Sequence, residues 1–222
     1  MIKGAIFDLD GVILDSMPFW EKAGEMFLRN LGLQPETGLA KTMYCMSMAE
    51  GAQYLKDRYH LGMDEDEIIK GVNQTIEDFY AYQIPLKEGV AQFLKGMQQH
   101  GIKMAVATSC DREVFARALQ RLNVMGYFDG IFTATEIGAG KVKPDIFLAA
   151  AEHMGTLPQD TWVFEDALYA IQTAKSAGFR TVGVYDAANR DDLDEIKRVS
   201  DFYLEKLDNI QVFLQKASVQ NA

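Results

Sequence analysis

The chain has 222 residues, of which 48% are hydrophobic and 24% charged, and its formal net charge is −10. This length suffices for one large or two modest domains with a buried core. The acidic excess argues against nucleic acid as a partner, because nucleic-acid binding relies on surplus Lys and Arg. No apolar run reaches the roughly 20 residues that span a bilayer, so we expect no membrane association and a cytoplasmic protein. The two cysteines, Cys45 and Cys110, are too few for a disulfide framework.

Short apolar runs, separated by helical patterns, organise most of the chain. They cover residues 4–8, 103–108, 130–134, 162–165 and 181–185. Runs that are apolar throughout are typical of strands in a parallel sheet buried on both faces. Between the later runs, apolar residues recur at helical spacing, as in Val114, Phe115 and Ala118. This alternation predicts an α/β protein with a doubly wound parallel sheet.

Residues 16–84 interrupt this alternation. No convincing strand pattern occurs there, and an apolar stripe at helical spacing contains Trp20, Ala23, Phe27 and Leu31. We therefore expect a catalytic core of residues 1–15 and 85–222, with an all-α cap domain of residues 16–84 inserted after the first strand. Ligands of such sheets bind beyond the carboxyl ends of the strands, where an inserted cap would act as a lid.

Polar residues follow four of the predicted strands. In chain order they are Asp8 and Asp10, Thr108 and Ser109, Lys141 and Lys143, and Glu165 and Asp166. Because the carboxyl ends of parallel strands share one edge of the sheet, we expect these residues to meet. Neighbouring carboxylates repel each other unless a cation compensates them. Oxygen ligands without clustered Cys or His suit Mg²⁺, which is the cofactor that we expect.

This set of side chains suits the hydrolysis of a phosphate monoester. The uncatalysed reaction is among the slowest known and demands up to about 10²¹-fold acceleration. A carboxylate nucleophile divides it into two easier steps through an aspartyl-phosphate, and Asp8 suits that role. Asp10 suits protonation of the departing alkoxide and activation of water. Lys141 would neutralise phosphoryl charge, and the hydroxyl of Thr108 would bind one phosphoryl oxygen.

Four segments occur in a characteristic order: FDLDGV (7–12), VATS (106–109), GKVKPD (140–145) and FED (164–166). In order and spacing they resemble the four motifs of the haloacid-dehalogenase-type phosphohydrolases, in the branch that contains β-phosphoglucomutases and small-capped phosphatases. The resemblance extends over nearly the whole chain. It implies a Rossmann-like core, a small helical cap between the first two motifs, and Mg²⁺-dependent phosphoryl transfer through an aspartyl-phosphate.

The resemblance assigns roles by position. It makes Asp8 the nucleophile, Asp10 the acid–base, Thr108 the phosphate-binding hydroxyl and Lys141 the charge clamp. It implies that Mg²⁺ is held by Asp8, the backbone carbonyl of Asp10 and Asp166, with Glu165 nearby. The residues that we expect to bind substrate are Gly11, Ser16, Trp20 and Ser109.

The fourth motif departs from the family pattern. Many members carry a further acid four residues after the first acid of a GDxxxD motif, whereas this chain reads EDALYA, with Ala167 and Ala170. We therefore expect the metal site to depend on the adjacent Glu165 and Asp166, as in the sugar-phosphate mutases of the family. Lys143 is an alternative candidate for the lysine that neutralises phosphoryl charge, but position in the motif favours Lys141.

Each motif also has a purely structural interpretation. Asp8 and Asp10 fit a polar turn in which Gly11 supplies an unusual backbone angle. Thr108 with Ser109, or Asp111, fits the cap of the next helix, and Glu165 with Asp166 fits a helix entry. The presence of four motifs at one edge of the sheet favours the catalytic interpretation.

We expect a Mg²⁺-dependent phosphatase that acts on a small phosphorylated metabolite, a sugar or polyol phosphate. The alternative is a β-phosphoglucomutase-like phosphotransferase, which shares the covalent intermediate. Where that branch begins its cap with a histidine this chain has Trp20, and the segment MYCMSMAEG lacks the arginine of the mutases. A pocket of Trp20, Tyr44 and methionines suits a less charged leaving group.

Two further functions are disfavoured by the same residues. A catalytically silent sugar-phosphate sensor has no use for the pair Asp8 and Asp10. A dehalogenase needs neither a leaving-group acid nor Mg²⁺, so Asp10 and the Glu165 and Asp166 pair argue against it. We expect a monomer or a weak dimer, and the sequence does not identify the metabolite.

Overall fold

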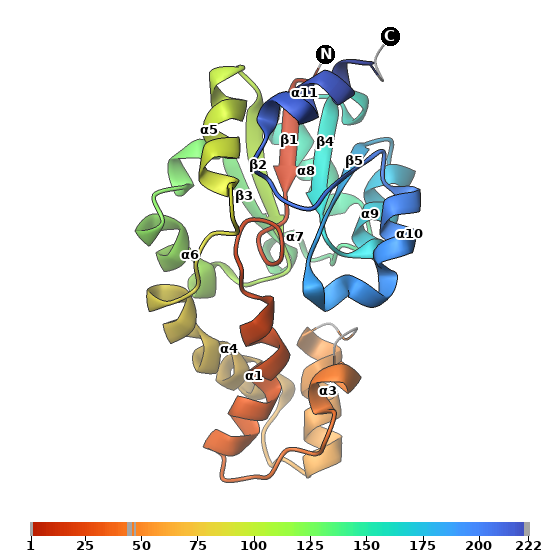
Figure 1. Ribbon diagram of the computed structural model, residues 1–222. Coiled ribbons are helices and arrows are strands. Elements are labelled where there is room, and N and C mark those ends of the chain that lie inside the picture. The colour runs from red at the N-terminus through yellow and green to blue at the C-terminus, as the bar shows by residue number, and fades with distance from the viewer. Residues whose placement is uncertain (1, 44–45, 47, 220–222) are drawn as a thin grey trace. The chain divides into compact units, whose positions relative to one another are not determined.

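The computed structural model describes residues 2–43, 46 and 48–219 and divides into two compact units (Figure 1). Met1–Asp15 together with Pro85–Ala222 form the first, which we call the core unit, and Ser16–Ile84 form the second, the helical unit. Tyr44, an expected pocket residue, and Cys45 lie outside the described residues. Within the described ranges, no helix is both long and apolar enough to cross a membrane.

A six-stranded parallel sheet forms the centre of the core unit, with the strand order β3-β2-β1-β4-β5-β6. The strands are β1 (Gly4–Phe7), β2 (Lys103–Thr108), β3 (Gly130–Thr133), β4 (Thr161–Glu165), β5 (Arg180–Val184) and β6 (Phe202–Leu204). The predicted α/β fold with a doubly wound parallel sheet is confirmed.

Helices connect these strands, and one further helix, α11, follows the last strand. They are α5 (Val90–Gln99), α6 (Arg112–Arg121), α7 (Ala134–Ile137), α8 (Asp145–Met154), α9 (Leu168–Ser176), α10 (Leu193–Val199) and α11 (Ile210–Val219). Three short 3₁₀ helices accompany them: η1 (Met125–Tyr127), η2 (Pro158–Asp160) and η3 (Ala187–Asp192). Figure 1 shows α5 and α11 on one face of the sheet and α8 on the other.

Alternate residues of the central strands pack against these two layers. On one face, Ile6 of β1 and Val163 of β4 belong to an apolar cluster with Phe147 of α8. On the opposite face, rings from β1, β4, α5 and α11 form an aromatic cluster: Phe7, Phe93, Trp162, Phe164 and Phe213. Burial on both faces explains why the central strands are apolar along most of their length.

The position of β1 determines where polar side chains can meet. β1 pairs with β2 on one side and with β4 on the other, and Phe7 is in register with Val106 and Phe164. The order of the strands reverses direction at β1, and such a switch point leaves a crevice beyond the carboxyl ends of the strands. Residues that directly follow β1, β2 and β4 therefore gather at one place.

The apolar-run pattern does not predict β6. This strand has only three residues, Phe202, Tyr203 and Leu204, and all three are half-buried because β6 is an edge strand paired only with β5 among the described residues. Such a short run does not stand out from a loop by composition. The five predicted strands agree with β1 to β5 to within a residue at each end.

The helical unit contains α1 (Met17–Asn30), α2 (Leu39–Met43), α3 (Met48–Tyr59) and α4 (Glu65–Tyr82). α4 begins with a capping box, in which the side chains of Asp64 and Glu67 each accept a hydrogen bond from the other residue's backbone N–H. Of the apolar stripe at helical spacing, Trp20, Ala23 and Phe27 lie in α1, whereas Leu31 follows the last residue of the helix and is 43% exposed.

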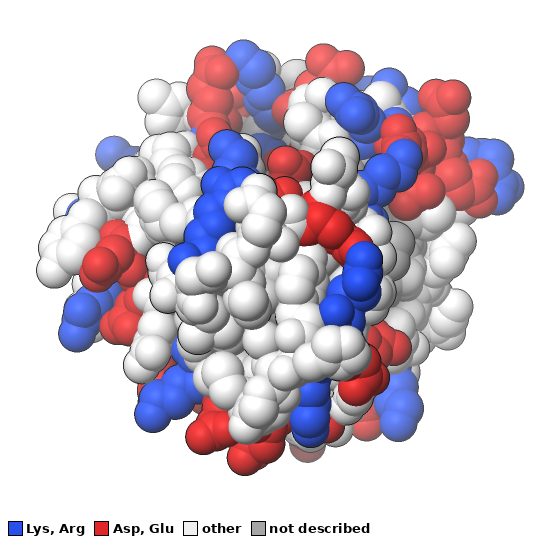
Figure 2. All heavy atoms as spheres, turned by 90° about the horizontal axis from the view of Figure 1, so that it is seen from below, with Lys and Arg blue, Asp and Glu red and all other residues white. Residues whose placement is uncertain are grey.

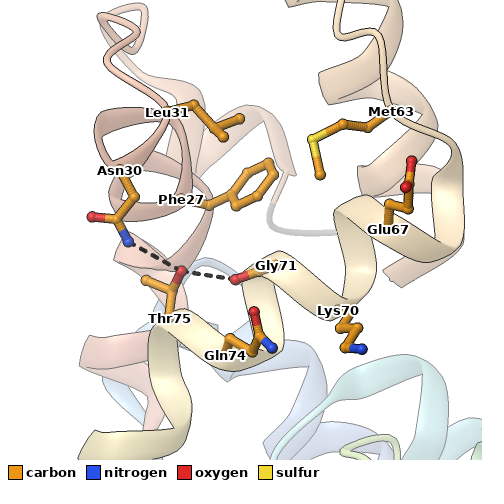
Figure 3. A pocket seen from close by; sticks show the side chains of 9 residues that line it. All are labelled: Phe27, Asn30, Leu31, Met63, Glu67, Lys70, Gly71, Gln74 and Thr75. Atoms are coloured by element: carbon orange, nitrogen blue, oxygen red, sulfur yellow. Dashed lines mark hydrogen bonds between the residues drawn. The ribbon is translucent and has the colours of Figure 1, made fainter.

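A close approach of α1 and α4 shapes one side of the helical unit. The ring of Phe27 on α1 lies against Gly71 on α4, where an added Cβ would come within 2.3 Å of the ring (Figure 3). Next to this contact is a groove of about 500 Å³. It is lined by Phe27, Asn30, Leu31, Met63, Glu67, Lys70, Gly71, Gln74 and Thr75.

Charged side chains of both signs are interspersed on the face shown in Figure 2. Among the described residues on that face, Lys and Arg form no continuous basic surface. With a net charge of −10, attraction of an anionic substrate therefore depends on local cations rather than on the field of the whole molecule.

We predict that the aromatic face of the sheet contributes much of the stability of the core unit. Phe213 on α11 is fully buried against Trp162 and Phe164, so Phe213→Ala should lower the free energy of unfolding by about 3–5 kcal/mol. The adjacent Val212 is 39% exposed, and Val212→Ala should change the free energy by no more than about 0.5 kcal/mol. Urea unfolding of both variants measures the difference, and equal values would show that α11 does not anchor the aromatic face.

Candidate active site

The chain leaves β1 in a tightly closed loop that carries the first predicted motif. The backbone N–H of Asp8 donates to Phe164 O at 2.9 Å, which extends the ladder between β1 and β4 by one residue. The loop then closes on itself through Leu14 N to Leu9 O at 2.8 Å and Gly11 N to Leu14 O at 3.0 Å. The carboxylate of Asp8 is thereby held at the centre of the sheet edge, 9% exposed.

Lys141 reaches Asp8 from the loop between α7 and α8. Its Nζ donates to Asp8 Oδ1 and, at 2.6 Å, to Glu165 Oε1, and the side chain is buried. Burial alone would lower the pKa of Lys141, but the carboxylates of Asp8 and Glu165 outweigh it and raise the pKa above its ordinary value. The ammonium therefore stays charged. Lys143, the competing candidate, is exposed.

Three carboxylates converge around this ammonium. One oxygen from each of Asp8, Glu165 and Asp166 lies within 4.8 Å of the others. Burial raises the pKa of Glu165 to about 7, with Lys141 opposing the shift and Asp8 adding to it. Burial, followed by the charges of Asp8 and Glu165, holds the pKa of Asp166 well above its usual range. Both shifts have the same causes: burial of the carboxyl group comes first, and the negative charge of neighbouring carboxylates adds to it.

The donor set fits a hard divalent cation. Metal binding requires the three carboxylates to be ionised, and the one ammonium then leaves two negative charges within the cluster, which a doubly charged cation would balance. The donors are all oxygens, which Mg²⁺ and Ca²⁺ prefer, and the cluster contains neither Cys nor His.

Gly11 of the first motif lies directly against the carboxylate of Asp166 in the fourth motif. Gly11 has a φ of +83°, a backbone angle that residues with a Cβ rarely adopt. A Cβ added at Gly11 would lie 2.3 Å from Asp166 Oδ2, so only a glycine leaves room for this carboxylate. Gly11 was expected to bind substrate; the structure places it against the metal-ligand candidate Asp166.

The second motif lies at the end of β2. Thr108 is buried, and its Oγ1 accepts a hydrogen bond from Cys110 N at 3.0 Å, so the hydroxyl also stabilises the turn into α6. Ser109 is exposed. Asp111 occupies the N-cap position of α6, but its side chain makes no cap hydrogen bond and instead accepts one from Thr135 at 2.6 Å.

Two of the expected substrate residues, Ser16 and Trp20, belong to the helical unit. Ser16 is buried and precedes α1, and its side chain makes no cap hydrogen bond to that helix. Trp20 is half-buried, and its indole N–H donates to the hydroxyl of Tyr80 at 2.5 Å. Their roles in binding substrate stay predictions, as do the catalytic roles of Asp10 and Thr108.

Residues outside the predicted motifs contact the cluster or the loop beside it. Asn189 in η3 donates to Asp166 Oδ2 at 2.7 Å. Lys87 donates to Gly11 O at 2.6 Å and to Asp186 Oδ2 at 2.8 Å. Asp186 comes directly after the fifth predicted strand and could have been found by the rule that revealed the other strand-end residues. Lys87 and Asn189 carry no comparable signal in the sequence.

Comparison with known proteins agrees with this arrangement. Residues 5–184 match the family described as haloacid dehalogenase-like hydrolase. The chain belongs to this family. It is 30% identical to hexitol phosphatase A of Escherichia coli (strain K12) over 217 residues, which cover 96% of this chain and 95% of that protein. It is 31% identical to the fructose-1-phosphate phosphatase of the same organism over 190 residues, which cover 82% and 95% respectively.

The solved structure of another protein has the same fold as this haloacid dehalogenase-like hydrolase. A β-phosphoglucomutase from Clostridium difficile aligns with it at a TM-score of 0.81, over 100% of this chain and 99% of the other, with 20% identity. The predicted resemblance to the family and the predicted class of enzyme, a hydrolase, are both confirmed.

We predict that Lys141 is essential to the stability of the metal-free hydrolase. Lys141→Met leaves Asp8 and Glu165 buried without their shared ammonium, which should lower the free energy of unfolding by about 3–5 kcal/mol. Lys143→Met removes an exposed ammonium from the same loop and should cost no more than about 0.5 kcal/mol. Urea unfolding in the presence of a chelator measures both, and a Lys141→Met variant as stable as Lys143→Met would contradict the charge balance described above.

A second prediction isolates the contact between Gly11 and Asp166. Gly11→Ala and Gly138→Ala both introduce a Cβ at a positive φ, +83° and +75°, at a cost of about 1–2 kcal/mol each. Gly138 has nothing within 4 Å of the added Cβ, whereas at Gly11 it would collide with Asp166. Gly11→Ala should therefore cost about 1–3 kcal/mol more than Gly138→Ala, by the usual penalty of overpacking. Equal losses in denaturant unfolding would mean that Asp166 moves aside freely.

Proposed function

We propose that this protein is a Mg²⁺-dependent phosphatase that hydrolyses a small sugar or polyol phosphate through an aspartyl-phosphate. The observation that carries the proposal is the convergence of Asp8, Lys141, Glu165 and Asp166 at the carboxyl edge of the sheet. Phosphoryl transfer requires a nucleophile and positive charge that stabilises the phosphoryl oxygens. Here a carboxylate lies beside a charged ammonium and a cation site.

The first half of the reaction forms a covalent intermediate on Asp8. A carboxylate oxygen of Asp8 attacks phosphorus, the bond between phosphorus and the ester oxygen breaks, and Asp10 donates a proton to the departing alkoxide. Lys141, which already donates to Asp8, faces the phosphoryl oxygens as negative charge spreads across them. Thr108 at the end of β2 donates its hydroxyl hydrogen to one of these oxygens.

The second half returns the enzyme to its starting state. Asp10 accepts a proton from water, the resulting hydroxyl oxygen attacks phosphorus, and the bond between phosphorus and Asp8 breaks. Inorganic phosphate leaves, and Asp8 is again a carboxylate. A single residue thus acts first as an acid and then as a base, which accounts for an aspartate two positions after the nucleophile.

The residues proposed to hold the cation are Asp8, Asp166 and the backbone carbonyl of Asp10. When bound, Mg²⁺ supplies positive charge that offsets the carboxylates and the oxygens of the phosphoryl group. Glu165 is predicted to lie in the metal site as well. Its Oε1 accepts a hydrogen bond from Lys141 and its Oε2 accepts a longer one, 3.4 Å, from Ala167 N, which favours a role in orienting Lys141.

The substrate class follows from the relatives and from local charge. Two relatives near 30% identity are named as phosphatases of a hexitol and of fructose 1-phosphate. In the helical unit, Trp20 is half-buried, and its indole N–H donates to the hydroxyl of the buried Tyr80, which fixes the ring. The exposed part of the Trp20 ring suits the apolar face of a sugar or polyol rather than a second phosphate group. The helical unit is proposed to serve as the cap that selects the substrate.

We predict Mg²⁺-dependent release of phosphate from at least one member of a panel of sugar and polyol phosphates. Asp8→Asn should lower this turnover by at least about a thousandfold, because it removes the nucleophile. Asp15→Asn, an exposed aspartate at the end of the same loop, should leave turnover unchanged. The assay measures released phosphate with Mg²⁺ and with a chelator, while β-glucose 1-phosphate with its bisphosphate is followed for isomerisation in parallel.

The outcomes separate the candidate functions. Phosphate release without isomerisation supports the phosphatase. Isomerisation faster than phosphate release would assign the protein to the mutases instead. Binding of sugar phosphates with no turnover at saturating Mg²⁺ would identify a sensor, and full activity of Asp8→Asn would remove Asp8 from the role of nucleophile.

A further inference from the structure

Asn189 contacts the proposed metal ligand Asp166 from outside the four motifs. It lies in η3, after β5, is 8% exposed, and donates from Nδ2 to Asp166 Oδ2 at 2.7 Å. The NH₂ end of the Asn189 amide thus faces Asp166, as it must when that carboxyl group is ionised to serve as a metal ligand. At Asn189 the backbone departs from helical angles, with φ −99° and ψ 18°, and η3 is kinked there.

The segment that carries Asn189 is held by Asp186. Oδ1 of Asp186 accepts a hydrogen bond from Ala188 N at 2.9 Å, and its backbone carbonyl accepts one from Asn189 N at 3.2 Å. Its Oδ2 accepts one from Lys87 Nζ at 2.8 Å. Asp186 is buried and Lys87 is half-buried, with side-chain exposures of 7% and 18%. The turn that presents Asn189 is therefore fixed by a charge pair with little solvent access.

Lys87 connects this turn to the loop after β1. Besides Asp186, its ammonium donates to Gly11 O at 2.6 Å and to Tyr185 O at 2.5 Å. Gly11 in turn lies directly against the carboxylate of Asp166. Gly11 and Asn189 therefore both approach Oδ2 of Asp166, and Lys87 connects Gly11 with the turn that carries Asn189.

We propose that Asn189 is a positioning residue for the divalent cation, and that the Lys87 and Asp186 pair holds Asn189 in place. The proposal rests on the metal site of the proposed function. By binding Oδ2, Asn189 prevents rotation of the carboxylate and leaves Oδ1 of Asp166 to face the cation. Partners that orient a ligand in this way typically contribute about 10–100-fold in metal affinity.

The test is Mn²⁺ binding to the full chain, measured by loss of the free-ion signal in electron paramagnetic resonance, with no turnover involved. Asn189→Leu keeps the approximate shape of the side chain and removes its amide, and Asn189→Ala removes both. Each should raise the dissociation constant for Mn²⁺ about 10–100-fold. Arg190→Ala alters the exposed neighbour in the same turn and should leave the constant unchanged.

Activity provides a second readout that a merely structural role would not produce. In Asn189→Leu, the Mg²⁺ concentration for half-maximal activity should rise by the same factor as the Mn²⁺ constant, and saturating Mg²⁺ should restore turnover. Lys87→Met should shift both quantities in the same direction by a smaller factor.

The outcomes distinguish this inference from the proposed function. If the wild-type chain binds Mn²⁺ and Asn189→Leu binds it equally well, the positioning role is overturned and the phosphatase stands. If the wild-type chain binds no Mn²⁺, both are overturned. Loss of turnover in Asn189→Leu that saturating Mg²⁺ does not restore, with Mn²⁺ binding unchanged, would place Asn189 in some other role.

Discussion

A buried excess of negative charge is the constraint on which this structure depends. Asp8, Glu165 and Asp166 bring carboxylate oxygens within 4.8 Å of one another, and Lys141 compensates only part of their charge. Burying an ion costs several kcal/mol even after the protein relaxes, so a cluster of this kind lowers the stability of the empty fold. The same charge gives the site its affinity for a divalent cation and, through Lys141 and that cation, for a phosphoryl group.

The parallel sheet keeps these carboxylates together in spite of their mutual repulsion. Hydrogen bonds within the sheet fix the ends of β1 and β4 side by side, so the backbone that carries Asp8 and Glu165 cannot separate to relieve their repulsion. Aromatic packing on one face and a mixed apolar cluster on the other stabilise the central strands. The favourable burial of those apolar side chains offsets the unfavourable burial of the carboxylates. The loops at the sheet edge then only orient the carboxylates.

The sequence predicts the parts of the site that follow from strand periodicity, and misses those that follow from the path of a loop. Apolar runs that end in acids predicted both the sheet and the residues at its edge, among which the structure joins Lys141 to Asp8 and Glu165. The approach of Asn189 to Asp166 depends on how the segment after β5 turns back, which no short pattern encodes. The bond between Trp20 and Tyr80 joins residues 60 positions apart and was hidden for the same reason.

Locating a cation in the crystal tests the central claim most directly. Crystals of the wild-type protein soaked in Mn²⁺ and measured at its absorption edge should show a single strong anomalous peak at the sheet edge. The account places this peak about 2.1 Å from oxygens of both Asp8 and Asp166, with Lys141 still within hydrogen-bonding distance of Asp8. A peak remote from these two carboxylates would contradict the account. So would the absence of a peak between them in crystals soaked at saturating Mn²⁺.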